Sequence, residues 1–279
     1  MSDVPLLSIK NVAVDYPTKG FRKAPFRALE DVTLDVHEGQ TVGLVGESGS
    51  GKTTLGRAVL GLAPVTQGSI TYRGRDITHI GRRDRRALSR EIQVVFQDPY
   101  TSLNPVMSVE SILAEPLTVQ GTSPADARRR VAELLDQVGL PSDAGQRQPR
   151  DFSGGQRQRV AIARALALSP RLIVCDEPVS GLDLSTQSRV LDLLIDIQQR
   201  TGVSYLFVTH DISVVRYISH DVAVMYRGSI VEQGDADAVT STPTHAYTQQ
   251  LMFAAPLADP AAQARRREER HRLAAASRS

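Results

Sequence analysis

Short apolar runs, separated by Gly, Pro and Asp, predict β-strands in the first third of the chain. They are LLSIKNV at 6–12, VTLDV at 32–36, TVGLV at 41–45, SITYR at 69–73 and IQVVF at 92–96. TVGLV leads directly into a glycine, which is typical of a buried parallel strand before a turn. The segment 16–27 is basic and is interrupted by Pro and Gly, so we expect a loop there.

The apolar pattern changes to a helical period between about residues 99 and 168. One set of apolar residues recurs at i, i+3, i+4 and i+7, the spacing of one face of a helix. Its members are Val131, Leu134, Leu135 and Val138. Ser153 is a suitable N-cap for a further helix that continues to Leu166. This part of the chain is therefore predicted to be helical.

Strands and helices alternate again after the helical part. LIVCD at 172–176 and YLFVT at 205–209 are typical of buried strands, and a helical apolar stripe lies between them. The stripe consists of Val190, Leu191, Leu194 and Ile197. A helical segment inserted into an α/β core explains this order.

The C-terminal part contains a predicted hairpin and a basic tail. VAVMY at 222–226 and SIVEQ at 229–233 flank Arg227-Gly228, a suitable hairpin turn. Beyond Pro256 the chain is rich in Ala and Arg, with RRREERHR at 265–272. We expect that tail to be disordered or a loosely docked helix.

Length and composition agree with one large domain that carries an inserted subdomain. The chain has 279 residues, 41% of them hydrophobic, and a formal net charge of +2, so no overall field favours nucleic acid. Its one cysteine, Cys175, excludes a disulfide within the chain and fits a reducing compartment. Neither a signal peptide nor a spanning apolar run is present. We therefore expect a soluble chain that contacts a membrane only through a partner.

A complete phosphate-binding loop pattern follows the strand at 41–45 and precedes a helical run. Its residues are Gly46, Glu47, Ser48, Gly49, Ser50, Gly51, Lys52, Thr53 and Thr54. The glycines let backbone N–H groups converge on phosphate oxygens, and the helix N-terminus adds its dipole. Lys52 is expected to reach the β- and γ-phosphates, and the Thr53 hydroxyl is expected to ligate Mg²⁺.

Two carboxylates end the apolar strand LIVCD. Asp176 is placed to hold the shell of a magnesium ion, usually through water, and Glu177 to polarise an attacking water. Taken alone, the pair could also be strand-end acids in a turn. Gln97 and His210 also end predicted strands. By themselves they are an ordinary polar loop residue and a structural histidine.

The order and spacing of six segments resemble the ATP-binding cassette (ABC) ATPases from about Leu6 to Gly234. The segments are GESGSGKTT, FQDP, FSGGQRQR, LIVCDEP, SGLD and VTHD. The resemblance implies an ATPase in which Gln97 is the Q-loop residue, Asp183 the D-loop acid and His210 the switch histidine. It also implies a signature motif formed by Ser153, Gly154, Gly155 and Gln156. Tyr16 falls where the family stacks an aromatic ring on adenine, although Phe21 or Phe26 could serve instead.

The resemblance also explains a second glycine-rich anion signal at 151–160. In this family two cassettes dimerise head to tail, and the signature of one chain closes over the γ-phosphate held by the other. Ser153 and the N–H groups after it lie at the N-terminus of a second helix, where an anion can bind. The two signals are thus expected to be halves of a shared site. Phe152 stands where the family usually has Leu.

Several segments resemble the peptide and nickel importer branch of the family. They are QDPYTSLNPVMSV at 97–109, PVSGLDLSTQSRVLDLL at 178–194, the basic insertion at 17–27 and PTHAYTQQLMFAAP at 243–256. Ala246 replaces a proline of the branch, and Gly181 stands where alanine is common. The last segment has no cysteine, so the iron–sulfur cluster of some members is not expected.

The branch implies the ATPase subunit of a dipeptide or oligopeptide importer, at the cytoplasmic face of the membrane. The implied partners are a second ATPase chain, identical or paralogous, two transmembrane permeases and, indirectly, a solute-binding protein. A nickel or glutathione importer is an alternative. A soluble ABC ATPase without a transport function is another.

The resemblance predicts an α/β fold with three parts: a P-loop NTPase core of mixed sheet and flanking helices, an antiparallel β subdomain and an inserted α-helical subdomain. The ATPase domain is expected at 1–235, the insertion at about 98–168 and a C-terminal extension at 236–279. The expected cofactors are ATP and Mg²⁺, with Thr53, Gln97 and Asp176 around the metal. Glu177, His210, Lys52 and Gln97 are the expected catalytic residues.

Overall fold

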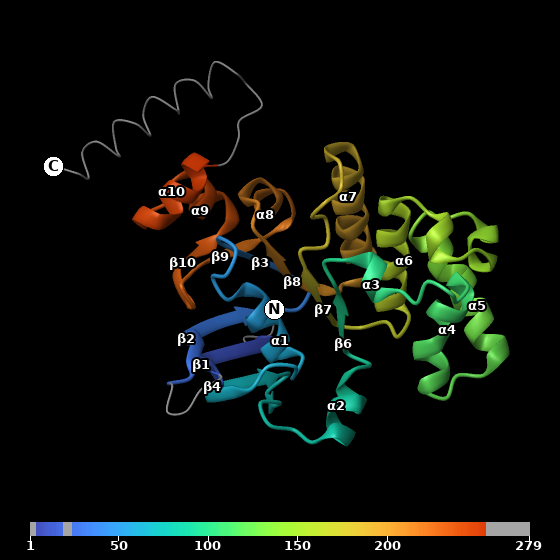
Figure 1. The fold of residues 1–279 in the computed structure, drawn as a ribbon, viewed down its shortest axis with the longest axis horizontal. Helices are drawn as coiled ribbons and strands as arrows, with labels where there is room; N and C mark the ends of the chain where they lie inside the picture. Colours follow the sequence, from blue (N-terminus) through green and yellow to red (C-terminus); the bar gives the residue numbers. More distant parts are fainter. Residues whose placement is uncertain (1–3, 19–23, 255–279) are drawn as a thin grey trace, which may run out of the picture.

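Two β-sheets organise the protein (Figure 1). The computed structural model describes residues 4–18 and 24–254, so Phe21 and the predicted basic tail lie outside the described residues. One sheet is antiparallel, in the order β2-β1-β4-β5. Its strands are β1 (Leu7–Tyr16), β2 (Phe26–Val36), β4 (Val65–Tyr72) and β5 (Arg75–Asp76).

The second sheet has six strands in the order β10-β9-β3-β8-β7-β6. They are β3 (Thr41–Val45), β6 (Ile92–Val95), β7 (Leu172–Asp176), β8 (Ser204–Thr209), β9 (Asp221–Tyr226) and β10 (Ser229–Asp235). All neighbours pair in parallel except β9 and β10, which form an antiparallel hairpin. Parallel pairing brings the carboxyl ends of β6, β7 and β8 to one edge of the sheet.

Helices cover the mixed sheet and form a separate lobe, on the right in Figure 1. That lobe contains α3 (Pro99–Ser102), α4 (Val109–Val119) and α5 (Pro124–Gln137), the 3₁₀ turns Ser142–Gln146 and Pro149–Asp151, and α6 (Gly154–Leu166). The other helices are α1 (Lys52–Val59), α2 (Arg82–Leu88), α7 (Leu184–Thr201), α8 (Ile212–Ile218), α9 (Ala236–Ser241) and α10 (Ala246–Ala254). The helical period between 99 and 168 thus corresponds to observed helices. The domain boundaries themselves stay a prediction.

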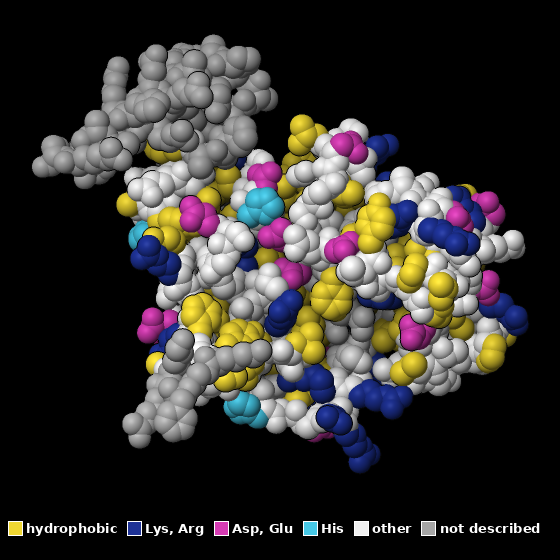
Figure 2. All heavy atoms as spheres, in the orientation of Figure 1, with side chains coloured by type: hydrophobic (Ala, Val, Ile, Leu, Met, Phe, Trp, Pro, Cys, Tyr) yellow, Lys and Arg dark blue, Asp and Glu magenta, His cyan; other side chains and the backbone are white. Residues whose placement is uncertain are grey.

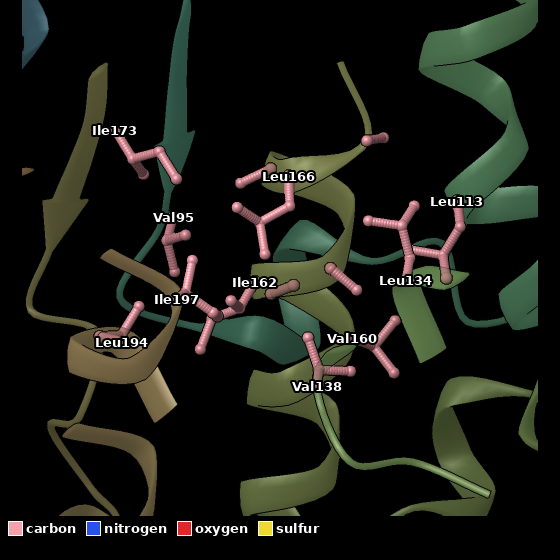
Figure 3. Close-up of a cluster of buried hydrophobic side chains, with 14 of the residues drawn as sticks. Val95, Leu113, Leu134, Val138, Val160, Ile162, Leu166, Ile173, Leu194 and Ile197 are labelled. Atoms are coloured by element: carbon pink, nitrogen blue, oxygen red, sulfur yellow. The ribbon is translucent and has the colours of Figure 1, made fainter. Parts of the chain in front are cut away.

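Two apolar clusters hold these layers together. The first joins one face of the mixed sheet to α6, α7 and the helical lobe, through residues such as Val95, Ile162, Leu166 and Leu194 (Figure 3). The second lies between the antiparallel sheet, α1 and the opposite face of the mixed sheet. Cys175 is fully buried in the first cluster, and burial raises the pKa of its thiol, in agreement with a packing role.

The predicted loop at 16–27 is shorter in the structure, which is a correction. Tyr16 still belongs to β1 and pairs with Phe26 of β2, while the Arg27 side chain donates to Asp15 at 3.0 Å. Pairing with a neighbouring strand therefore outweighs the local Pro and Gly signals at both ends of the segment. The hairpin at Arg227-Gly228 is observed, with Tyr226 opposite Ser229 and both turn residues at positive φ.

Candidate active site

The phosphate-binding loop connects β3 to α1. Gly51 is the N-cap residue of α1 and has a φ of 109°. A Cβ at this position would lie 2.7 Å from Leu29 Cδ2 and 3.0 Å from the Ala28 carbonyl oxygen. Only glycine fits this backbone. The N–H groups in the first turn of α1 have no acceptor within the helix, so they are available to an anion in the loop.

Lys52 is buried, with 4% of its surface exposed, and its ammonium group folds back onto the loop. The Nζ atom donates to the carbonyl oxygens of Gly46 at 2.7 Å and Glu47 at 2.8 Å. Burial lowers the pKa of Lys52, against the opposing effect of Glu177 and Asp176. A cation enclosed in this way is positioned for an anionic ligand in the loop.

Thr53 and Asp176 bring a hydroxyl and a carboxylate together. Thr53 Oγ1 donates to Asp176 Oδ1 at 2.9 Å. Burial raises the pKa of Asp176, although the hydrogen bond from Thr53 acts in the opposite direction. Mg²⁺ commonly binds one or two carboxylates together with substrate phosphates and water, so this oxygen pair fits it. Among the described residues, no group of three or more His, Cys, Asp and Glu forms a protein-only metal site.

Glu177 is the centre of a second cluster, at the carboxyl edge of the mixed sheet. Its Oε2 accepts from Gln97 Nε2 at 3.3 Å and lies 3.1 Å from His210 Nδ1. Glu177 has a φ of 48°, an uncommon conformation for a residue with a side chain, and its N–H donates to the Val208 carbonyl oxygen at 2.9 Å. This hydrogen bond to β8 therefore fixes the backbone that carries the Glu177 carboxylate.

A pocket of about 710 Å³ lies between the phosphate-binding loop and the Glu177 cluster; Asp176 is bonded to Thr53 but does not itself line it. It is lined by Tyr16, Phe26, Ala28, Glu47, Ser48, Gly49, Gly51, Lys52, Thr53, Thr54, Gln97, Glu177, His210 and Leu251. Most of the residues predicted from the loop pattern, together with Gln97, Glu177 and His210, thus surround one space.

The signature residues do not line this pocket. Ser153 caps α6, accepting from the Gln156 N–H at 3.4 Å, while the Ser153 N–H donates to the Gln156 side chain at 3.0 Å. A Cβ at Gly154 would lie 3.5 Å from Leu182. The signature thus lies beside the segment that leads to Asp183, away from the phosphate-binding loop of its own chain.

Asp183 caps the next helix. Its carboxylate accepts from the Thr186 N–H at 3.0 Å and the Ser185 hydroxyl at 2.7 Å. These hydrogen bonds lower the pKa of Asp183 well below its ordinary value. In this chain the carboxylate therefore holds the start of α7.

Sequence reasoning missed two residues of the pocket region from the C-terminal part. Leu251 lines the pocket, and the Tyr247 hydroxyl accepts from the Glu47 N–H at 2.9 Å. Both belong to α10, within the PTHAYT segment and the residues after it. The only sequence signal was the recurrence of that segment in one branch of the family, which did not associate it with the phosphate-binding loop.

Tyr16 and Phe26 both line the pocket from paired strands, so either ring could stack on adenine. Tyr16 is half-buried and packs against the second core cluster, whereas 60% of the Phe26 surface is exposed.

We expect Tyr16→Ala to raise the Kd for ATP about tenfold, because a fixed ring is the better stacking platform. Phe26→Ala should change it less than about threefold. Equilibrium binding of a fluorescent ATP analogue measures both, and the reverse order would assign the base to Phe26.

Comparisons with known proteins show the family and the fold. A family model described as ABC transporter matches residues 29–180. The chain belongs to the ABC transporter family. The predicted α/β P-loop fold is confirmed, because cbiO1 from Clostridium perfringens has a TM-score of 0.76 at 27% identity, over 85% of this chain and 91% of that one. The cassette MJ0796, in a dimeric post-hydrolysis state bound to ADP and Pi, has a TM-score of 0.74 at 29% identity, over 82% and 98%.

Curated relatives share close to half of the residues. The oligopeptide transport ATP-binding protein OppD of Mycobacterium bovis is 50% identical over 84% of this chain, but the match spans only 38% of OppD. A peptide import ATP-binding protein of Brucella ovis is 46% identical over 95% of this chain and 83% of its own length. The glutathione import ATP-binding protein GsiA of Salmonella paratyphi A is 46% identical over 92% of this chain and 42% of its own length.

Proposed function

We propose that this ABC family member is the ATP-binding and ATP-hydrolysing subunit of an importer for dipeptides or oligopeptides. The observation that carries the proposal is the pocket lined by Lys52, Thr53 and the Glu177 cluster, with Asp176 hydrogen-bonded to Thr53 beside it. Relatives named for oligopeptide transport and peptide import support the cargo.

The described residues perform distinct tasks in this proposal. The loop amides and Lys52 bind the β- and γ-phosphates of ATP. Thr53 and Asp176, with Gln97 beside them, would hold Mg²⁺, which would neutralise charge on the phosphate oxygens. Glu177 accepts the proton of the attacking water, and His210, 3.1 Å away, orients the carboxylate and contacts the γ-phosphate. Lys52 stabilises the negative charge that develops on the phosphate oxygens as the bond to the leaving ADP breaks and water attacks the γ-phosphoryl group.

The position of the signature indicates one of the proposed partners, a second ATPase chain. Residues 153–156 lie outside the pocket of their own chain, so they are available to a second ATPase chain, identical or paralogous. The dimeric MJ0796 cassette supports such a pairing. The remaining proposed partners are two permeases and, through them, a solute-binding protein.

The proposed location is the cytoplasmic face of the membrane, as a peripheral subunit. None of the helices within 4–18 and 24–254 combines the length and apolar character that a membrane crossing requires. Permeases would therefore supply the spanning segments that the proposal needs.

A test of hydrolysis uses the purified chain and its Lys52→Ala variant. We expect Mg²⁺-dependent release of phosphate from ATP by the parent chain, and a loss of about 10²-fold in the variant, because the cation at the phosphates is removed. A phosphate-release assay with and without EDTA measures both. A parent chain that neither binds nor hydrolyses ATP would contradict the proposal.

A test of the cargo uses cells that lack the gene. Restoring the parent chain should restore uptake of labelled di- and oligopeptides, whereas the Lys52→Ala variant should not. Glutathione import is the second candidate, because GsiA is nearly as similar as the peptide relatives. Labelled glutathione supplied in parallel separates the two cargoes, and recovery of glutathione uptake alone would assign the second.

A further inference from the structure

Helix α10, the last described helix, contacts the phosphate-binding loop across 200 positions of sequence. Tyr247 is buried, with 7% of its surface exposed, and its hydroxyl accepts the Glu47 N–H at 2.9 Å. Glu47 is the second residue of the loop, and its carbonyl oxygen accepts from Lys52 Nζ. The tyrosine is therefore connected through a single residue, Glu47, to the ammonium group of Lys52.

Several contacts fix Tyr247 in place. Its ring packs on Tyr226, at the end of β9, with 4.2 Å between the ring centroids. The Glu232 carboxylate of β10 accepts from the Thr244 N–H at 2.7 Å and the His245 N–H at 3.2 Å. Burial acts to raise the pKa of Glu232, but the hydrogen bonds from the α10 segment outweigh it and lower that pKa. The hairpin of the mixed sheet thus holds the start of α10.

Leu251 extends the same helix face into the pocket. It follows Tyr247 by four positions, the spacing that places two side chains on one face of a helix. It lines the pocket together with Tyr16 and Lys52, so α10 contributes an apolar surface beside the place for a nucleotide. Figure 1 places α10 beside β9 and β10, on the side of the molecule away from the helical lobe.

We propose that α10 is a wall of the nucleotide site, in which Tyr247 positions the phosphate-binding loop and Leu251 contacts the bound adenine nucleotide. The inference rests on the proposed function, since ATP is the ligand. Holding the Glu47 N–H keeps the loop in one conformation before ATP arrives, so less ordering remains for binding to supply. Without the tyrosine hydroxyl, the Glu47 N–H loses its protein acceptor and that end of the loop is released.

The test compares Tyr247→Phe with the parent chain. The substitution keeps the ring and its packing on Tyr226 but removes the hydrogen-bond acceptor. We expect the Kd for ATP and for ADP, and the KM for ATP, to rise about three- to tenfold, the effect of one hydrogen bond. We expect kcat to change less than about twofold, because Glu177 keeps its contacts. Tyr217→Phe is the matched control: it removes a hydroxyl bonded to Asp192, outside the pocket, and should leave binding unchanged.

Two further variants separate positioning from general stability. Glu232→Ala releases the start of α10 without touching the pocket, and should raise the Kd for ATP in the same direction as Tyr247→Phe, with less than additive effects in the double variant. Leu251→Ala should raise the Kd for ATP with little change in thermal melting of the nucleotide-free chain.

The outcomes distinguish this inference from the proposed function. If the parent chain binds and hydrolyses ATP and Lys52→Ala does not hydrolyse it, the proposed function stands and the Tyr247 variants decide. An unchanged Kd in Tyr247→Phe would then overturn the positioning role alone. A Kd that rises only in proportion to a lower melting temperature, or equally in Tyr217→Phe, would also overturn it. A parent chain without ATP affinity would overturn both.

Discussion

Replacing Glu177 with glutamine is expected to reduce ATP hydrolysis by about 10²-fold or more, while ATP binding stays close to that of the parent chain. Glutamine keeps the size of the side chain and an oxygen that can accept from Gln97, which lies 3.3 Å away in the parent. It removes the group that accepts the proton of the attacking water. The chain should therefore bind ATP, close into a dimer and remain in that state.

Steady-state phosphate release, ATP binding and a sizing column measure the three parts of this expectation. Glu133→Gln is a matched control, because it makes the same chemical change on α5, where Glu133 pairs with Arg130 at 3.1 Å. Hydrolysis by Glu177→Gln within a few-fold of the parent would remove Glu177 from the role of general base. Loss of ATP binding instead would indicate that the substitution had disturbed the backbone at residue 177, which has an uncommon φ of 48° in the parent.

The parts of the site that depend on local spacing could be predicted from the sequence. The phosphate-binding loop is continuous, so its glycines, Lys52 and Thr53 are identified by their order. Gln97, Glu177 and His210 were each placed after a strand, but strand order is not written in the sequence. The order β8-β7-β6 brings those three strand ends together, and only the family resemblance had implied it.

Other features had no local signal. The helix α2 has no buried residue and therefore no apolar stripe to recognise. Figure 2 shows Lys and Arg side chains at the lower edge of the face, where Figure 1 places α2. The contact of Tyr247 with Glu47 joins residues 200 positions apart, so it depends on how α10 docks on the hairpin. Contacts of that kind arise from packing and cannot be obtained from the period of one segment.

The position of the signature predicts the result of mixing two defective chains. Lys52→Ala removes the cation at the phosphates, and Ser153→Arg blocks the N-terminus of α6 with a bulky side chain. Each variant alone should fail to form an ATP-dependent dimer. If the signature serves the partner chain, the mixture contains dimers in which one site carries both lesions and the other carries neither. ATP-dependent dimer should therefore reappear on a sizing column.

Ser123→Arg is the matched control for this experiment, since Ser123 caps α5 as Ser153 caps α6, by accepting from a backbone N–H. It removes a cap and adds the same side chain far from the pocket, so its dimer should form as in the parent. If the signature instead served its own chain, every site in the mixture would stay defective. A parent chain that dimerises while the mixture does not would contradict the shared site. If the parent itself stays monomeric with ATP, the partner is a paralogous chain, and the two lesions must then be divided between the different subunits.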